Sequence, residues 1–245
     1  MIELNGFGWR LGNQLFQIAA AIGLAKKYND TVYFPDWNYS RYFEGDFSNY
    51  KSREDTDNHY NEPYFAYNEI PYKKNIAISG YFQSPKYFAN CKKFIRQTFK
   101  LKPVETSIEI LPNSCFIHVR RGDYTNLADH HPLKTWDNYY KEAVGKMEQF
   151  FPAKYYIFSD ELEKVKSEFP EHQLFEYVDG GDEITDFYLM TKCQYHIIGN
   201  SSFSWWAAWL SEQENSQTIA PKEWFGPALR QHNLKDLFPT EWIVI

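Results

Sequence analysis

The stretch Cys115-Phe116-Ile117-His118-Val119-Arg120-Arg121-Gly122-Asp123 begins as an apolar run and ends in a polar cluster. Similar short apolar runs alternate with helix-like segments through the rest of the chain, at Tyr155–Phe158, Leu174–Val178, His196–Ile198 and Thr218–Ala220. Continuous apolar strands separated by helices are typical of a parallel sheet that is covered by helices. The second half of the sequence therefore predicts an α/β fold.

Polar residues follow three of these apolar runs. Arg120 and Arg121 come after the first run, Ser159-Asp160 after the second, and Asn200-Ser201-Ser202 after a third, where a helix opens. Ligands of open α/β sheets bind outside the carboxyl ends of the strands, so we expect these clusters to converge on one site. Two arginines beside a helix N-terminus favour an anion such as a diphosphate. The alternative is that the arginines only pair with Asp123 and that the serines only cap the helix.

A glycine-rich loop, Gly6-Phe7-Gly8-Trp9-Arg10-Leu11-Gly12, precedes a helix-like segment near the N-terminus. With Asp36 about two dozen residues further on, it roughly mimics a dinucleotide-binding fingerprint. The glycine spacing differs, however, and Trp9 and Arg10 stand where the backbone should approach a pyrophosphate. The sequence therefore gives little support to a dinucleotide oxidoreductase.

Composition restricts the class of partner. The chain of 245 residues has 26 Lys and Arg against 32 Asp and Glu, a net charge of −6, so we expect no nucleic-acid partner. Its three cysteines show no metal-ligand spacing and are expected to be free thiols of a reducing compartment. No apolar run is long enough to span a membrane and no secretory leader is recognisable, so we expect a cytoplasmic protein. The 19% of aromatic residues fits both core packing and stacking on sugars.

Residues 36–74 are aromatic, polar and aperiodic, which is typical of a functional surface. Within them, Asp55-Thr56-Asp57 could be a metal-binding carboxylate pair. The pair falls in a hydrophilic loop rather than at the end of a strand, so we expect a solvated loop and no bound metal. If a diphosphate leaves from this protein, the arginines then have to replace a metal cation.

The clusters resemble the motifs of the bacterial α-1,2-fucosyltransferases of glycosyltransferase family 11. Similar blocks occur in the order of that family over nearly the whole chain, at Arg10–Gln17, Ser79–Ser84, His118–Tyr124, Phe158–Asp160, Asp186–Met190, Ile198–Trp206 and Pro221–Phe225.

This resemblance implies a fold of the GT-B type, with two Rossmann-like domains that face a central cleft. Residues 1–110 would form the acceptor-side domain and residues 111–245 the donor-binding domain. It implies a galactoside 2-alpha-L-fucosyltransferase, which moves L-fucose from GDP-β-L-fucose to the 2-hydroxyl of a galactoside with inversion and without a metal or other cofactor. The implied partners are GDP-fucose and a galactose-containing glycan. The protein would be cytoplasmic, or peripheral at the inner face of the membrane.

The resemblance also implies roles for single residues. Arg120 and Arg121 would hold the β-phosphate and stabilise the departing diphosphate. The acceptor hydroxyl has to lose a proton, and Asp123 is either the base or a residue that orients Arg121. The other implied site residues are His118 and Asp160 at the nucleoside, Ser201 and Ser202 at the diphosphate, Asn200 and Phe203 beside them, and Arg10, Asn13 and Gln14 reaching from the N-terminal domain toward the donor sugar and acceptor.

Two other hypotheses stay open. The protein could transfer another GDP-linked deoxysugar, or use another acceptor hydroxyl, because the matching residues hold the nucleotide rather than the sugar. It could also be a non-catalytic carbohydrate-binding module, which the aromatic content permits. The paired arginines argue against a module because a lectin has no use for a diphosphate site.

Overall fold

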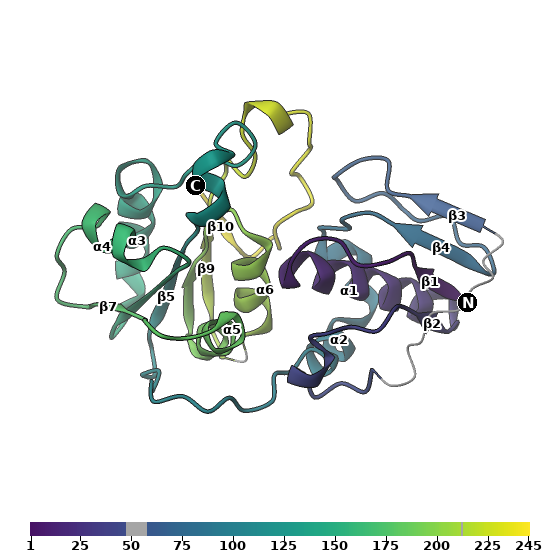
Figure 1. Cartoon of the computed structure of the whole chain (residues 1–245), viewed down its shortest axis with the longest axis horizontal. Coiled ribbons are helices and arrows are strands. Elements are labelled where there is room, and N and C mark those ends of the chain that lie inside the picture. Colours follow the sequence, from purple (N-terminus) through teal and green to yellow (C-terminus); the bar gives the residue numbers. More distant parts are fainter. Residues whose placement is uncertain (48–57, 212) are drawn as a thin grey trace. The chain divides into compact units, whose positions relative to one another are not determined.

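The computed structural model describes residues 1–47, 58–211 and 213–245 and divides into two compact units (Figure 1). The first unit is Met1–Lys102 with His232–Pro239, and the second is Pro103–Gln231 with Thr240–Ile245. The carboxylates Asp55 and Asp57 lie outside the described residues.

The first unit contains a parallel sheet of four strands in the order β2-β1-β4-β3. The strands are β1 (Ile2–Leu4), β2 (Val32–Tyr33), β3 (Asn58–Asn61) and β4 (Ile76–Ser79). The helical segments are α1 (Leu11–Tyr28), η1 (Ser40–Tyr42), η2 (Pro85–Cys91) and α2 (Lys92–Thr98), of which η1 and η2 are 3-10 helices.

Helix α1 forms because its apolar residues recur at helical spacing and find a packed surface. Leu15, Ile18 and Ile22 are at most 1% exposed. A Cβ at Gly23 would lie 2.2 Å from the carbonyl oxygen of Tyr87, so only glycine lets α1 approach η2 this closely. This packing holds α1 against η2, and the glycine-rich loop joins the start of α1 to β1.

The second unit contains a parallel sheet of six strands in the order β10-β9-β8-β5-β6-β7. The strands are β5 (Cys115–Val119), β6 (Tyr155–Ser159), β7 (Phe175–Tyr177), β8 (Tyr195–Ile197), β9 (Gln217–Ala220) and β10 (Ile243–Val244). Counted within this unit from β7, the order is 3-2-1-4-5-6, that of a doubly wound Rossmann sheet. The order reverses between β5 and β8, which is where such sheets bind ligands.

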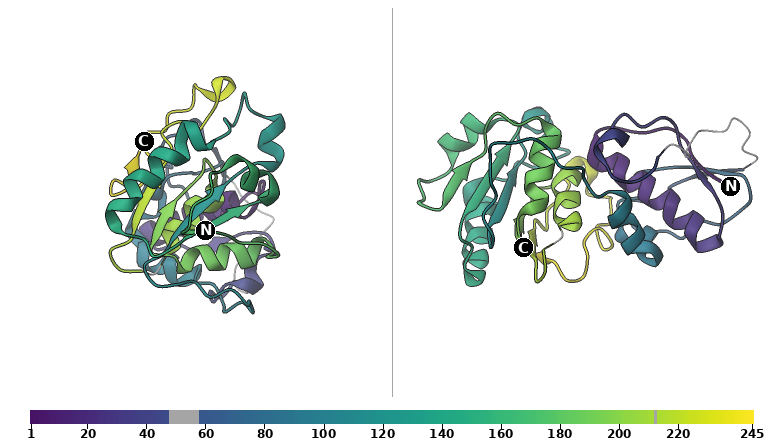
Figure 2. Two further views of the ribbon diagram at one scale, coloured as in Figure 1. Left: turned by 90° about the vertical axis from the view of Figure 1, so that its left-hand side faces the viewer. Right: turned by 90° about the horizontal axis from the view of Figure 1, so that it is seen from below.

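Helices cover both faces of this sheet, with α3 and α4 on one side and α5 and α6 on the other (Figures 1 and 2). Cys115, Ile117 and Val119 belong to the core cluster under α3 and α4. Because side chains alternate along a strand, His118 points to the opposite face. The helical segments are η3 (Gly122–Asn126), the π-helical turn η4 (Trp136–Tyr140), α3 (Lys141–Met147), η5 (Glu148–Phe150), α4 (Leu162–Glu168), α5 (Glu183–Lys192), α6 (Ser202–Leu210) and η6 (Pro227–Leu229).

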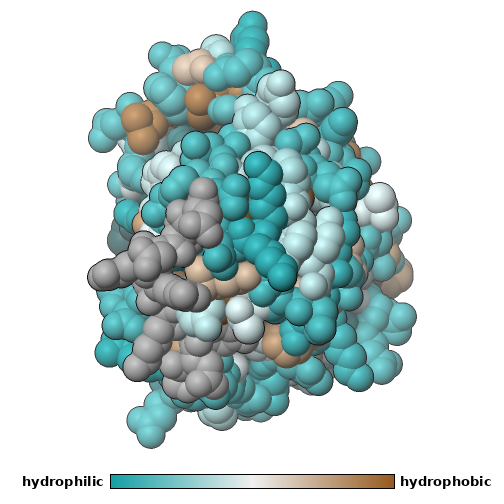
Figure 3. Space-filling view, turned by 90° about the vertical axis from the view of Figure 1, so that its right-hand side faces the viewer, coloured by the Kyte–Doolittle hydropathy of each residue, from teal (hydrophilic) through white to brown (hydrophobic). Residues whose placement is uncertain are grey.

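The expected α/β class with parallel sheets is confirmed. The compact boundary falls after Lys102 rather than after residue 110, and His232–Pro239 pack with the first unit. Two domains that face a cleft, and their acceptor and donor roles, stay predictions. Within the described ranges, the structure contains no helix that is both long and apolar enough to cross a membrane. The face shown in Figure 3 is mostly hydrophilic, with scattered apolar residues.

Candidate functional site

The candidate site lies at the carboxyl ends of β5, β6 and β8 in the second unit. A Cβ at Gly199 would lie 3.0 Å from the carbonyl oxygen of His118, so the ends of β5 and β8 are in close contact. The hydroxyl of Tyr124 donates a hydrogen bond to the carbonyl oxygen of Asn200 at 3.0 Å. The structure therefore brings together the polar clusters that the sequence predicts to converge.

Arg120 is the cation at this edge of the sheet, and its side chain is 13% exposed. One terminal nitrogen donates to Asp160 at 2.8 Å and the other to Asp123 at 2.5 Å. The guanidinium also lies over the ring of Tyr124, 5.5 Å from its centroid. A guanidinium has five N–H donors, so these contacts orient Arg120 while, among the described residues, its Nε–H and two further N–H groups stay available for a ligand.

Asp160 fixes the loop that carries Arg120. One carboxylate oxygen accepts the backbone N–H of Arg121 at 2.8 Å, and the other accepts from the side chain of Arg120. A Cβ at Gly122 would lie 2.4 Å from this second oxygen, so glycine is needed where the carboxylate meets the loop. Asp160 is therefore a positioning residue in this structure, and its expected contact with the nucleoside stays a prediction.

The structure corrects the role expected for Arg121. Its side chain is 1% exposed, and Nε and one terminal nitrogen donate to Glu168 at 3.0 and 2.5 Å. The other terminal nitrogen donates to the carbonyl oxygens of Arg120 and Lys134. Arg121 is thus buried and hydrogen-bonded inside the unit, so it supports the loop and does not present its charge to a phosphate.

Asp123 contacts Arg120 rather than Arg121, which corrects the orienting role that the sequence analysis considers for it. Its side chain is 47% exposed. A carboxylate in this place both orients the cation and is open to a substrate. Its role as the base stays a prediction.

The N-terminus of α6 adds a second positive element to the site. Ser201 is the N-cap residue and has an extended backbone, but among the described residues its side chain makes no capping hydrogen bond. The first N–H groups of a helix point outward and attract anions. The Ser201 hydroxyl and the helix amides therefore suit a phosphate, with Ser202 at the first helical position.

Asn200 has a structural role that the sequence analysis did not foresee. It is 2% exposed, and its side-chain nitrogen donates to the carbonyl oxygens of Pro132 and Trp224 at 3.1 and 3.2 Å. Asn200 therefore fixes the turn between β8 and α6. This corrects its expected donor contact to a positioning role.

His118 is an uncharged group in this site. It is 5% exposed, its ring lies 5.5 Å from that of Phe203, and its Nδ1 has no hydrogen-bond partner among the described residues. Burial, helped by the charge of Arg120, lowers the pKa of His118 to about 3. The imidazole therefore stays neutral near pH 7. It can donate one hydrogen bond and accept another, but it is too weakly basic to act as a general base.

Asp186 was not singled out from the sequence, where it is only part of a family block. It lies in the first turn of α5, and burial together with repulsion by Asp182 raises its pKa to about 7. One of its carboxylate oxygens has no hydrogen-bond partner in the described part of the chain. A half-buried carboxyl with a strongly raised pKa is typical of functional sites. The sequence signal that could have pointed to Asp186 is the neighbouring Gly180-Gly181 turn, because glycine lets the chain approach this carboxylate.

The residues predicted in the first unit lie around the start of α1. Arg10 is its exposed N-cap residue. Asn13 accepts a hydrogen bond from Gln83 at 2.7 Å. Gln14 donates to the carbonyl oxygen of Trp9 and accepts from the indole of Trp37. Gln14 thus stabilises the glycine-rich loop and Asn13 contacts the segment after β4, while their expected contact with donor and acceptor stays a prediction.

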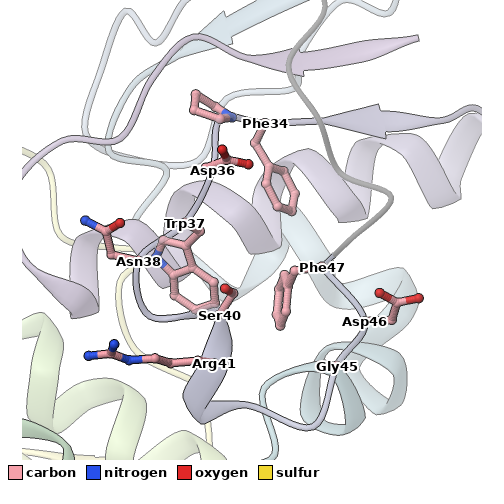
Figure 4. A pocket seen from close by; sticks show the side chains of 10 residues that line it. Phe34, Asp36, Trp37, Asn38, Ser40, Arg41, Gly45, Asp46 and Phe47 are labelled. Carbon is pink, nitrogen blue, oxygen red and sulfur yellow. The ribbon is translucent and has the colours of Figure 1, made fainter.

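A pocket of 470 Å³ follows β2 in the first unit (Figure 4). The rings of Phe34, Trp37 and Phe47 form its aromatic side, and Asp36 and Arg41 lie at its rim. Phe34 and Trp37 are at most 5% exposed, so they belong mainly to the core. A ligand role for the stretch 36–74 stays a prediction.

Comparisons with known proteins find related sequences. The family model described as glycosyl transferase family 11 matches residues 39–245. An alpha-1,2-colitosyltransferase of Escherichia coli is 32% identical over 71% of this chain and 63% of its own length. A galactoside 2-alpha-L-fucosyltransferase of Caenorhabditis elegans is 27% identical over 69% of this chain and 52% of its own length. The chain thus spans between half and two thirds of these relatives.

A solved structure resembles the fold. The crystal structure of POFUT1 in complex with GDP superposes with a TM-score of 0.53, over 89% of this chain and 97% of that chain, at 10% sequence identity. Identity this low speaks for the fold alone.

Proposed function

The chain belongs to glycosyltransferase family 11, and from this premise we propose that it moves L-fucose from GDP-β-L-fucose to the 2-hydroxyl of a galactoside, with inversion and without a metal ion. The observation that carries the proposal is the oriented Arg120 at the reversal of the Rossmann sheet, in the loop that contacts the turn before α6. A cation and helix amides at this place suit the diphosphate of a nucleotide sugar.

The chemistry follows from where charge develops. The bond between the anomeric carbon and the β-phosphate oxygen breaks, and its electron pair leaves with GDP. Fixed positive groups at the leaving oxygens then stabilise the transition state more than the ground state. Arg120 and the N-terminus of α6 take this role, which a bound metal would otherwise have to fill.

The acceptor hydroxyl attacks the opposite face of the sugar and loses its proton to a carboxylate. We assign Asp123, the half-exposed carboxylate beside Arg120, as the base that accepts this proton. His118, which is neutral, would serve as a hydrogen-bonding partner of the nucleoside rather than as the base. The three cysteines are free thiols, which favours a cytoplasmic enzyme.

A second candidate donor deserves the same test. The relative with 32% identity is named for the transfer of colitose and the one with 27% for the transfer of fucose, while both names specify a linkage to position 2. Colitose is fucose without its 3-hydroxyl group. The name of the more similar relative therefore favours GDP-colitose as the alternative donor with the same linkage.

The test is transfer by the purified protein to lactose, with GDP-fucose and GDP-colitose compared at equal concentration. The linkage of the product is read by NMR spectroscopy. Fucose on O2 of galactose supports the proposal, and colitose there with no fucosyl product supports the alternative donor. If neither sugar nucleotide is consumed, or if GDP does not bind, both donors are excluded. A non-catalytic carbohydrate-binding module then remains.

A further inference from the structure

Trp9 has an unusual place in the first unit. Its side chain is 63% exposed, and its backbone has a φ of +61°. Left-handed backbone is costly for a bulky residue, and an indole exposed to water gains little from burial in return. Exposure and backbone strain together at one residue are typical of binding sites.

Trp9 forms a platform with Tyr81, which is 37% exposed. The two rings are stacked, with centroids 4.3 Å apart and planes 25° apart. They line a cavity of 230 Å³ at the carboxyl ends of the neighbouring strands β1 and β4. Open α/β sheets bind ligands at this end of their strands.

Hydrogen bonds hold both halves of the platform from behind. Gln17, 4% exposed, accepts the N–H of Gly8 at 3.1 Å and donates to the carbonyl oxygen of Gly80 at 2.9 Å. Glu62 accepts the backbone N–H of Tyr81 at 2.7 Å and that of the next residue. Gln14 donates to the carbonyl oxygen of Trp9. The two rings therefore lie on loops that are fixed before any ligand arrives.

The cavity suits an uncharged, hydroxyl-rich ligand. Its described lining has no charged side chain. Besides the rings of Trp9 and Tyr81, the polar side chains are those of Asn5, Gln17 and Ser79. Amides and hydroxyls match the hydroxyl groups of a sugar, and an aromatic face matches the C–H groups of a pyranose ring. A nucleotide would instead need a cation for its phosphates.

We propose that the Trp9–Tyr81 platform binds a pyranose ring of the acceptor glycan and so determines which acceptor is used. The existence of a sugar-stacking subsite in the first unit is inferred from the platform alone. Its assignment to the acceptor rests on the proposed function. Trp9 supplies the stacking face, and Tyr81 supports the indole from its other side.

The test uses the whole 245-residue chain with Trp9→Asn, Trp9→Phe and a control. Asparagine tolerates a left-handed backbone and removes the ring, whereas phenylalanine keeps a ring. Phe151→Asn is the matched control, because Phe151 is 82% exposed with a φ of +54° but ends the 3-10 helix η5. Lactose binding is followed by saturation-transfer NMR, and the acceptor KM is measured with GDP-fucose.

Trp9→Asn should raise the acceptor KM at least about tenfold and abolish saturation transfer to lactose, with the affinity for GDP retained. Trp9→Phe should keep the acceptor KM and the saturation transfer to lactose close to those of wild type, and Phe151→Asn should behave as wild type. An unchanged acceptor KM in Trp9→Asn, or a raised KM for GDP-fucose alone, would overturn the acceptor platform while transfer itself stands. Saturation transfer that depends on Trp9 in a protein without transferase activity would support the platform and reject the proposed function.

Discussion

Arg120 and Arg121 are neighbours in the sequence, but their side chains have different surroundings. Both residues follow the end of β5, where the chain turns, and one guanidinium lies at the ligand edge while the other enters the protein. Arg120 is held by two carboxylates at the rim, whereas Arg121 is 1% exposed and bound to Glu168. One arginine is therefore expected to serve chemistry and the other stability.

Arg120→Lys keeps the positive charge but loses the planar fork. We expect kcat to fall at least about tenfold, equivalent to about 1.4 kcal/mol of transition-state stabilisation, with little change in Tm. Steady-state kinetics and thermal unfolding of the same preparation check this. Unchanged kinetics would remove Arg120 from the diphosphate site.

Arg121→Lys is the matched comparison and should act on the fold. A single ammonium nitrogen cannot replace the three guanidinium nitrogens that reach Glu168 and two carbonyl oxygens in fixed directions, and each buried acceptor left unpaired costs about 1–3 kcal/mol. We expect a Tm lower by several degrees, about 2–4 °C for each kcal/mol. A variant that unfolds like wild type and loses turnover would show instead that Arg121 touches the substrate.

Asp186 should make stability depend on pH. Its pKa is raised to about 7 in the folded protein, from about 4 in an unfolded chain, so the folded state keeps a proton that the unfolded state releases. This contribution to stability is complete at acidic pH and is lost as the pH rises from about 4 to about 7. Asp186→Asn should therefore gain Tm relative to wild type at pH 8 and not at pH 4. An equal difference at both pH values would contradict the raised pKa.

At the scale of elements, the turn after β5 depends on the close approach of Gly122 and Asp160. Gly122→Ala would place a Cβ 2.4 Å from the Asp160 carboxylate, so the loop or the carboxylate has to move. We expect a loss of about 1–3 kcal/mol in stability and a lower kcat, because Asp160 also orients Arg120.

Gly145→Ala controls for the substitution itself. Gly145 lies inside α3, and a Cβ there meets nothing within 4 Å. Alanine should stabilise this helix by about 0.5–1 kcal/mol and leave kcat unchanged. If both variants unfold alike in urea, the contact between Gly122 and Asp160 is not important for the turn.

The sequence predicted those elements whose apolar pattern is strong. The runs beginning at Cys115 and Tyr155 form β5 and β6, because continuous apolar residues can be satisfied only inside a covered sheet. Strand β3, Asn58–Asn61, was not predicted, because it is polar and its residues are half-buried or exposed. Strand β10 has only two residues. The ion-pair partner of Arg121 could not be predicted from local sequence patterns either, since Glu168 is 47 residues away in the sequence.

At the scale of the whole molecule, we propose that the positive charge at the leaving group comes from the protein itself. Transfer is therefore expected to continue in EDTA at the rate measured without it, because Arg120 and the N-terminus of α6 occupy the place where a cation would act. Rates with EDTA, Mg²⁺ and Mn²⁺ check this. Loss of activity in EDTA that either ion restores would contradict metal-independent transfer.

The proposed function requires the second unit to bind a diphosphate through Arg120, and calorimetric titration with GDP and GMP tests this most directly. Arg120→Lys should lower the affinity for GDP at least about tenfold and leave the affinity for GMP nearly unchanged, since only GDP has the β-phosphate. Arg230→Lys, which changes an exposed arginine of the same unit, should affect neither nucleotide. Equal affinities of GDP in wild type and Arg120→Lys, or an equal loss for GDP and GMP, would contradict the site.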